Sequence, residues 1–157
     1  MRLLLDTHVL LAIIEPGTVR LPDSVAALIS DERNEHHLSA ASLWEIAIKC
    51  RLGKLRLTPS LAALPELVLG LGLTIVAINE RHAVGSVEPE PATRDPFDRM
   101  LLAQCQVEGL KLVTIDRALV SHPLAAKGPR VRSIEGRRHS LTPCGGGSGR
   151  QAEGLGS

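Results

Sequence analysis

Short apolar runs alternate along the chain with longer stretches in which hydrophobic residues recur at helical spacing. The short runs predict buried strands at residues 3–6, 36–39, 73–78 and 111–115, with a further strand at 131–134. The longer stretches predict helices at residues 7–14, 22–32, 42 to about 53, 61–69, 80–87 and 96–109. Strands that alternate with helices are typical of a parallel sheet covered on both faces, so we expect an α/β fold.

The end of the chain differs from the rest. Near residue 140 the periodicity and the apolar content both stop, and residues 145–149 read Gly-Gly-Gly-Ser-Gly. Such a composition is typical of a flexible linker. We therefore expect one domain over residues 1–138 and a flexible Gly/Ser-rich tail or appended linker over residues 139–157.

The composition fits an ordinary globular domain. The chain has 157 residues, 44% of them hydrophobic and 22% charged, which is enough for one core and short of two. Its formal charge of +1 argues neither for nor against nucleic acid, because a basic rim beside an acidic site would cancel in the sum. Trp44 and Phe97 are the only aromatic residues, which excludes a base-stacking platform of several aromatics.

Cysteine usage and the N-terminus bear on the compartment. The three cysteines are odd in number and lack a Cys-x-x-Cys spacing, as expected of thiols kept reduced rather than of a disulfide framework or a zinc site. The apolar run before Asp6 is too short for a signal peptide or a membrane span. We expect a cytoplasmic protein with no membrane association.

Two acidic residues stand where predicted strands end. Asp6 follows three leucines, and Asp116 follows the run that ends at Ile115. Ligands of parallel sheets bind at the carboxyl edge of the strands, so both acids are candidates for a site there. Either residue could instead only cap the helix that follows it.

Two further acids lie on predicted helices. Asp98 is in phase with Leu101, Leu102 and Cys105, on the face that a helix turns toward the core, although it could merely complement the helix N-terminus. Glu45 has two structural explanations, because Ser42 to Glu45 fits a capping box and Lys49 is suitably spaced for an ion pair. Glu45 is nevertheless a candidate for the same site, because it lies one turn into a helix that begins near the same sheet edge.

Convergence of these four carboxylates would require a cation. Two carboxylates about 4 Å apart repel each other by roughly 4 kcal/mol at an effective dielectric near 20. An all-oxygen ligand set suits Mg²⁺, or alternatively Mn²⁺, which could support phosphodiester hydrolysis by an activated water. The six histidines show no metal-ligand spacing, so we interpret them as surface or packing residues.

Four segments, each containing one of these acids, resemble the motifs of the PIN-domain nucleases, and more narrowly those of the VapC-type ribonuclease toxins of toxin-antitoxin pairs. The segments are residues 3–8, 39–46, 94–99 and 113–116, and the resemblance covers residues 1–134. It implies a three-layer α/β/α sandwich with a central parallel sheet of four to five strands.

The resemblance also implies the roles of individual residues. It assigns Asp6, Glu45, Asp98 and Asp116 to a catalytic metal site. Thr7 and Thr114 become supporting groups behind these ligands, and Asp95 is interpreted as a helix cap first and a ligand second. Two residues depart from the family pattern: Thr93 stands where many relatives carry His, and Ala12 where Trp is frequent. Both departures bear on substrate choice rather than on catalysis.

By the same resemblance the chain is a Mg²⁺- or Mn²⁺-dependent endoribonuclease and toxin, with RNA as its substrate, a cognate antitoxin as its partner and a homodimer as its assembly. Basic residues near the acids could contact phosphates: Lys49, Arg51, Lys54, Arg56, Arg99 and Arg117. Two alternatives remain open, a catalytically silent module that holds a basic partner in an acidic groove, and an Asp-based phosphoryl-transfer domain.

Overall fold

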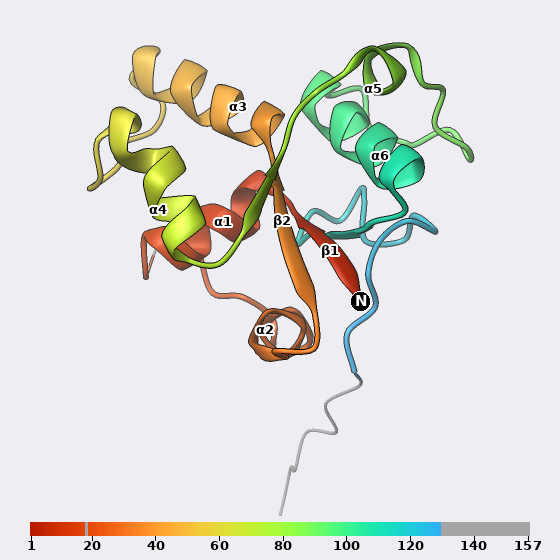
Figure 1. Cartoon of the computed structure of the whole chain (residues 1–157), viewed down its shortest axis with the longest axis horizontal. Helices are drawn as coiled ribbons and strands as arrows, with labels where there is room; N and C mark the ends of the chain where they lie inside the picture. The colour runs from red at the N-terminus through yellow and green to blue at the C-terminus, as the bar shows by residue number, and fades with distance from the viewer. Residues whose placement is uncertain (18, 130–157) are drawn as a thin grey trace, which may run out of the picture.

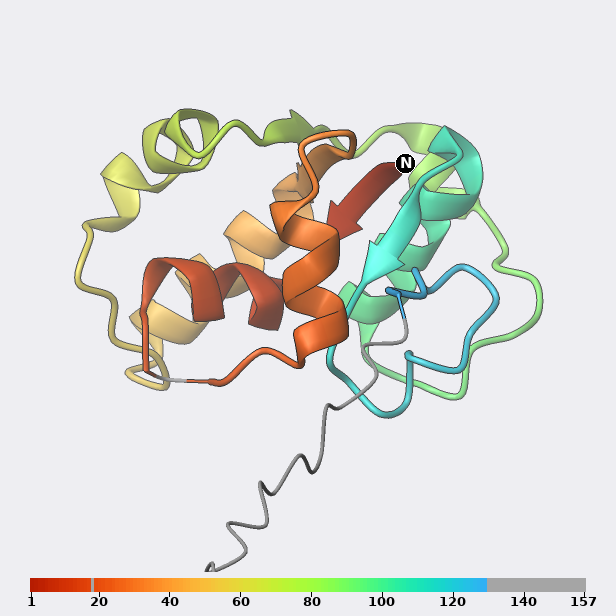
Figure 2. The same ribbon diagram turned by 90° about the horizontal axis from the view of Figure 1, so that it is seen from below.

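Four parallel strands form the sheet at the centre of the computed structural model, which describes residues 1–17 and 19–129. They are β1 (Arg2–Leu5), β2 (Glu35–Ser39), β3 (Thr74–Val76) and β4 (Lys111–Val113), in the spatial order β3-β2-β1-β4. Within the sheet, Leu5 of β1 lies opposite Leu38 of β2 and Val113 of β4. β1 and β4 run in the same direction (Figure 2), so their carboxyl ends meet at one edge.

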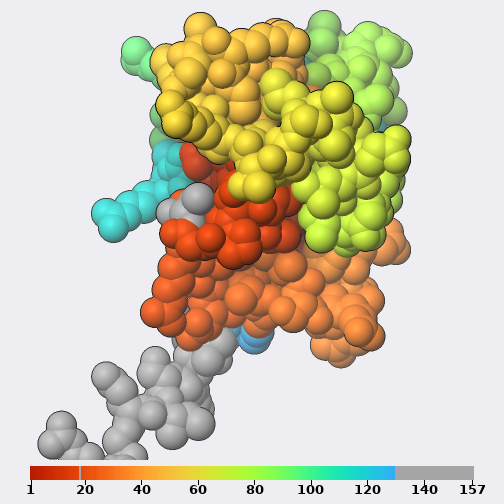
Figure 3. All heavy atoms as spheres, turned by 90° about the vertical axis from the view of Figure 1, so that its left-hand side faces the viewer, coloured from red at the N-terminus to blue at the C-terminus, as the bar shows by residue number. Residues whose placement is uncertain are grey.

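Helices cover both faces of this sheet. They are α1 (Thr7–Ile14), α2 (Asp23–Ser30), α3 (Ala40–Arg51), α4 (Leu64–Gly70), α5 (Glu80–Val84) and α6 (Pro96–Glu108), with a 3₁₀ turn η1 (Leu61–Ala63) before α4. Figure 1 shows α1, α3 and α4 on one side of β1 and β2, with α5 and α6 on the other. In Figure 3 the yellow α4 segment lies against red α1. In the part of the chain that the structure describes, no helix is long and apolar enough to cross a membrane.

The alternation of side chains along β1 explains the two cores. Leu3 and Leu5 point into a cluster with residues of α1 to α4, whereas Leu4 points into a second cluster with residues of α6 and β4. All three leucines are at most 1% exposed. Because successive strand residues face opposite sides, one apolar run supplies both interiors of the expected three-layer α/β/α sandwich.

The predicted elements are largely observed. Helix α1 has the predicted bounds, and α6 begins at Pro96 behind Asp95 and ends at Gly109, whose φ of 67° and ψ of 37° are the left-handed values common at helix ends. The predicted helix at 61–69 divides into η1 and α4. The strand predicted at 131–134 and the predicted tail lie outside the described residues.

The helix predicted from residue 42 begins two residues earlier, at Ala40. The capping box considered as an alternative role for Glu45 does not form, because the N-cap is Ser39, whose hydroxyl accepts a 2.9 Å hydrogen bond from the N–H of Ala41. Ser42 is instead buried within the first turn. As a consequence Glu45 lies farther into the helix than predicted, and its carboxylate is not used for capping.

Candidate active site

Asp6 stands at the carboxyl end of β1 and is almost fully buried, with 2% of its surface exposed. Its N–H donates to the carbonyl of Val113 at 3.0 Å, which extends the pairing with β4 one residue beyond the strand. Its Oδ2 accepts a 2.7 Å hydrogen bond from the hydroxyl of Thr114. Asp6 therefore lies where β1 and β4 end, as the strand pattern predicts.

Asp116 reaches the same edge from the loop after β4. Its N–H donates to the hydroxyl oxygen of Thr114 at 3.0 Å, so one threonine contacts both acids. Its Oδ1 accepts a 2.8 Å hydrogen bond from the N–H of Ala118, which stabilises the turn of the loop. Two acids 110 positions apart in the sequence are thus connected through a single hydroxyl group.

Asp98 lies in the first turn of α6, where two neighbours define its surroundings. Asp95 caps the helix, as predicted, and its Oδ1 accepts from the N–H groups of Phe97 at 2.8 Å and Asp98 at 3.4 Å. The hydroxyl of Thr93 donates to Oδ2 of Asp98 at 2.7 Å. The Asp98 side chain is half-buried, and the hydrogen bond from Thr93 connects it to the loop that precedes the helix.

The electrostatic surroundings of Asp98 connect it with the sheet edge. Burial raises the pKa of Asp98 above its usual value, and the negative charges of Asp95, Asp6 and Asp116 raise it further. The hydrogen bond from Thr93 acts in the opposite direction because it stabilises the ionised carboxylate. Asp6 and Asp116 come from other segments of the chain than Asp98 and are close enough to disfavour its negative charge.

Glu45 differs from the three aspartates because a cation already balances its charge. Its Oε1 lies 2.6 Å from Nζ of Lys49, one turn further along α3, which confirms the ion pair expected from their spacing. Its Oε2 accepts a 2.6 Å hydrogen bond from the hydroxyl of Thr7, the first residue of α1. With 7% of its surface exposed, Glu45 is fixed at both oxygens.

His8 is a neighbour of the acids that the sequence did not indicate. It is on the surface, as expected, but its Nδ1 lies 3.9 Å from Oδ2 of Asp6. The Asp6 carboxylate raises the pKa of His8, while burial and the charge of Lys49 oppose that effect. A histidine one residue beyond Thr7 in a helix that starts at the acidic edge could have been proposed from position alone.

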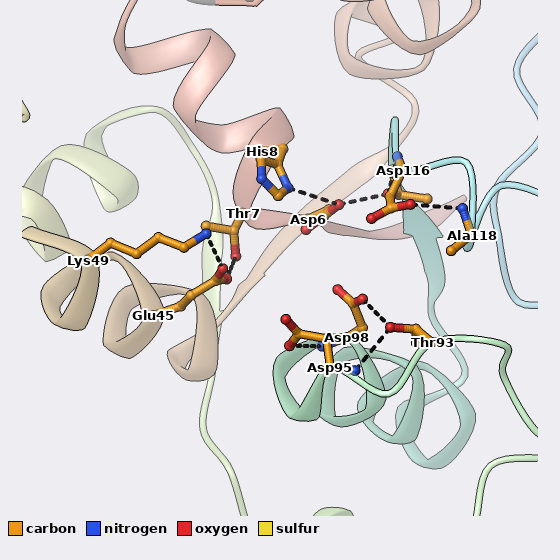
Figure 4. A network of polar contacts seen from close by, with 11 residues as sticks. Asp6, Thr7, His8, Glu45, Lys49, Thr93, Asp95, Asp98, Asp116 and Ala118 are labelled. Atoms are coloured by element: carbon orange, nitrogen blue, oxygen red, sulfur yellow. Dashed lines mark hydrogen bonds and ion pairs between the residues drawn. The ribbon is translucent and has the colours of Figure 1, made fainter. Parts of the chain in front are cut away.

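Figure 4 shows Asp6, Asp98 and Asp116 pointing toward one another from three different parts of the fold, with Glu45 beside them and turned toward Thr7 and Lys49. As they stand, no three His, Cys, Asp or Glu side chains within residues 1–17 and 19–129 are arranged so that they could hold a metal ion. The donor set nevertheless fits Mg²⁺ or Mn²⁺, because such ions use one or two carboxylates and keep several waters. The excess negative charge around Asp98 favours such a cation.

Two of the candidate phosphate-binding residues have partners in the fold. Lys49 is paired with Glu45, although 35% of its side chain remains exposed. Arg99 donates to the carbonyl of Thr93 at 3.1 Å and to Glu90 at 2.7 Å, so its guanidinium stabilises the loop before α6. Arg99 therefore stabilises the loop before α6, whereas Lys49 directly contacts one of the four acids.

A protein-family model and a named relative both match this chain. The family model described as PIN domain matches residues 3–123, which is most of the chain and contains all four acids. Ribonuclease VapC16 of Mycobacterium tuberculosis strain H37Rv is 42% identical over 57 residues. That stretch is 36% of this chain and 40% of the relative, so the similarity spans less than half of either protein.

Proposed function

Because the chain belongs to the PIN domain family, we propose that it is a metal-dependent endoribonuclease that acts as the toxin of a toxin-antitoxin pair. The observation that carries the proposal is the approach of Asp98 to Asp6 and Asp116, whose negative charges disfavour ionisation of Asp98 at the sheet edge. Such an arrangement costs free energy unless it serves a cation. The partial similarity to a protein named as a ribonuclease points to RNA as the substrate.

We assign the metal to Asp6, Glu45, Asp98 and Asp116, with Mg²⁺ as the ion and Mn²⁺ as the alternative. When bound, the ion supplies Lewis-acid chemistry: it acidifies water and stabilises the negative charge that develops on a phosphodiester during hydrolysis. Without a cation the same carboxylates repel a phosphodiester. The acidic edge is therefore a substrate site only when its charge is compensated.

The chain's own groups orient this chemistry. The hydroxyl of Thr114 holds one oxygen of Asp6, and the hydroxyl of Thr93 holds one oxygen of Asp98. Oδ1 of Asp98, which Thr93 does not contact, is the oxygen that would hold the ion. The ion would supply the acidification of the attacking water, and the carboxylates around it would orient that water.

Glu45 and Lys49 form the side of the site next to α1. Their ion pair is 2.6 Å long, and the ammonium group of Lys49 is partly exposed. We propose that Lys49 contacts a phosphate oxygen of the RNA and that Glu45 keeps the ammonium group in position. The pair is neutral as a whole, but its ammonium group offers a phosphate a hydrogen-bond donor where the three aspartates offer only negative charge.

The remaining parts of the proposal concern partners. A ribonuclease toxin requires a cognate antitoxin that suppresses cleavage, and we propose such a partner together with a homodimeric assembly, both on the basis of the family resemblance. The RNA that a toxin cleaves is cytoplasmic, so we propose the cytoplasm as the place of action. Co-purification with a small protein encoded by a neighbouring gene would identify the antitoxin.

Cleavage assays on the purified full chain test the activity. We expect single-stranded or structured RNA to be cut in Mg²⁺ or Mn²⁺ and to remain intact in EDTA, while DNA of the same sequence serves as the matched substrate control. A protein prepared identically with Asp6→Asn controls for contaminating nucleases. Cleavage that persists in EDTA would contradict the metal mechanism.

The assay also separates the proposal from a catalytically silent module that uses the acids to hold a basic partner. Such a module would leave RNA intact in every metal and would show no Mn²⁺ binding by calorimetry. The Asp-based phosphoryl-transfer domain considered from the sequence has no support from the family match, which covers residues 3–123 as a PIN domain.

A further inference from the structure

Thr93 lies in the loop before α6 and makes two hydrogen bonds through one hydroxyl group. It donates to Oδ2 of Asp98 at 2.7 Å and accepts from the N–H of Asp95 at 3.1 Å. The directions are unambiguous, because a backbone N–H can only donate and an ionised carboxylate can only accept. The single hydroxyl proton of Thr93 is therefore directed at Asp98.

The same local arrangement recurs on the other side of the acidic edge. Thr114 donates to Oδ2 of Asp6 at 2.7 Å and accepts from the N–H of Asp116 at 3.0 Å. In both segments a threonine stands two residues before an aspartate, accepts from its N–H and donates to an acid elsewhere in the chain. The resemblance to known nucleases indicated a supporting role for Thr114 but treated Thr93 only as a departure from the family pattern.

The backbone of Thr93 is also held in place. Its carbonyl accepts a 3.1 Å hydrogen bond from Nε of Arg99, whose Nη2 in turn lies 2.7 Å from Oε1 of Glu90. The carbonyl of Thr93 is thus fixed by Arg99, and its hydroxyl group is fixed by Asp98 and by the N–H of Asp95. A side chain held in this way can restrict the rotation of the carboxylate that it contacts.

We infer that Thr93 is a positioning residue for Asp98: its hydroxyl fixes Oδ2 and leaves Oδ1 directed toward Asp6 and Asp116. The inference rests on the proposed function, because its consequence is the affinity of the acidic edge for a divalent ion. The hydrogen bond and the fixed backbone of Thr93 carry the inference, because without the hydroxyl Oδ2 of Asp98 loses this partner and the carboxylate can rotate. Loss of this bond is expected to weaken ion binding as well as catalysis.

Thr93→Val in the full chain tests the inference, since valine keeps the branched shape and removes the hydroxyl. We expect the dissociation constant for Mn²⁺, measured by calorimetry or electron paramagnetic resonance, to rise about 10-fold or more, the usual cost of removing a group that supports a metal ligand. Thr93→Ser should restore the wild-type value. In cleavage assays Thr93→Val should lower kcat at fixed Mn²⁺ and leave KM for RNA nearly unchanged.

Thr58→Val is the matched control. The hydroxyl of Thr58 also donates to a carboxylate, that of Glu15 at 3.0 Å, but does so at the end of α1 away from the four acids. This variant should retain wild-type Mn²⁺ affinity. Thermal unfolding of both variants distinguishes two effects. A loss of α6 capping would lower Tm without changing the Mn²⁺ affinity, whereas a loss of positioning would change the Mn²⁺ affinity.

The outcomes distinguish the inference from the function on which it rests. If the wild-type chain neither binds Mn²⁺ nor cleaves RNA, the proposed function is wrong. If the wild type does both, and Thr93→Val binds Mn²⁺ within about twofold of Thr93→Ser, the positioning role of Thr93 is overturned while the function stands.

Discussion

Asp98→Asn should lower RNA cleavage by at least about 100-fold while the protein stays folded. Asparagine has nearly the same shape, and its carbonyl oxygen can still accept the hydroxyl of Thr93, whose hydrogen bond to Asp98 is 2.7 Å long. It lacks the negative charge that binds a cation. Initial rates on a defined RNA at saturating Mg²⁺ measure the effect.

Glu66→Gln is the control for this loss of charge. Glu66 is an exposed carboxylate in the first turn of α4, remote from the sheet edge, so its replacement should leave the cleavage rate unchanged. An Asp98→Asn variant that cleaved RNA at more than a tenth of the wild-type rate would contradict the role assigned to Asp98.

The pH dependence of stability supplies a second readout for the same variant. Since the folded state raises the pKa of Asp98, this carboxyl destabilises the fold increasingly as the pH rises above the unfolded-state pKa, and to the full extent above the folded-state pKa. Without metal, Asp98→Asn should therefore be at least as stable as the wild type near neutral pH. That advantage should disappear at acid pH, below the unfolded-state pKa, where the carboxyl is protonated in both states. Urea unfolding across this pH range checks the sign.

Divalent ions should raise the stability of the wild-type chain substantially. An ion that binds only the folded state stabilises it by about 2.7 kcal/mol at a concentration 100 times its dissociation constant. For a domain of this size that corresponds to an increase in Tm of roughly 5 to 10 °C, and EDTA should reverse it. Calorimetric scans with Mn²⁺ and with EDTA measure this difference.

The matched experiment uses Asp6→Asn. Asp6 is 2% exposed and its Oδ2 accepts the Thr114 hydroxyl, a hydrogen bond that asparagine can preserve. This variant should fold, but its Tm should no longer depend on Mn²⁺. An equal Mn²⁺-induced rise in the two proteins would mean that the stabilising ion binds elsewhere.

The sequence predicted the sheet edge because that prediction needs only local information and one general rule. Three leucines before Asp6 and an apolar run before Asp116 mark strand ends, and parallel strands end at a common edge. Asp98 was predicted to face inward from its phase with the apolar residues of α6, and it is half-buried beside the other acids.

Other features depend on tertiary contacts and could not be predicted. Ser39 and Ser42 both suit a helix start, and only the absence of a loop between β2 and α3 selects Ser39. The contact of Thr93 with Asp98 requires the course of the loop before α6. Trp44 and Phe97 are far apart in the sequence, yet they meet edge to face with ring centroids 5.5 Å apart because α3 packs against α6.

A crystal grown with Mn²⁺ and measured at a wavelength where manganese scatters anomalously tests the shared cation site most directly. We expect one or two anomalous peaks at the sheet edge, with oxygens of Asp6 and Asp98 roughly 2 Å from an ion and Asp116 close by. At saturating Mn²⁺, no peak near these carboxylates, or a peak bound by other residues alone, would contradict the assignment of the four acids to one metal-dependent nuclease centre.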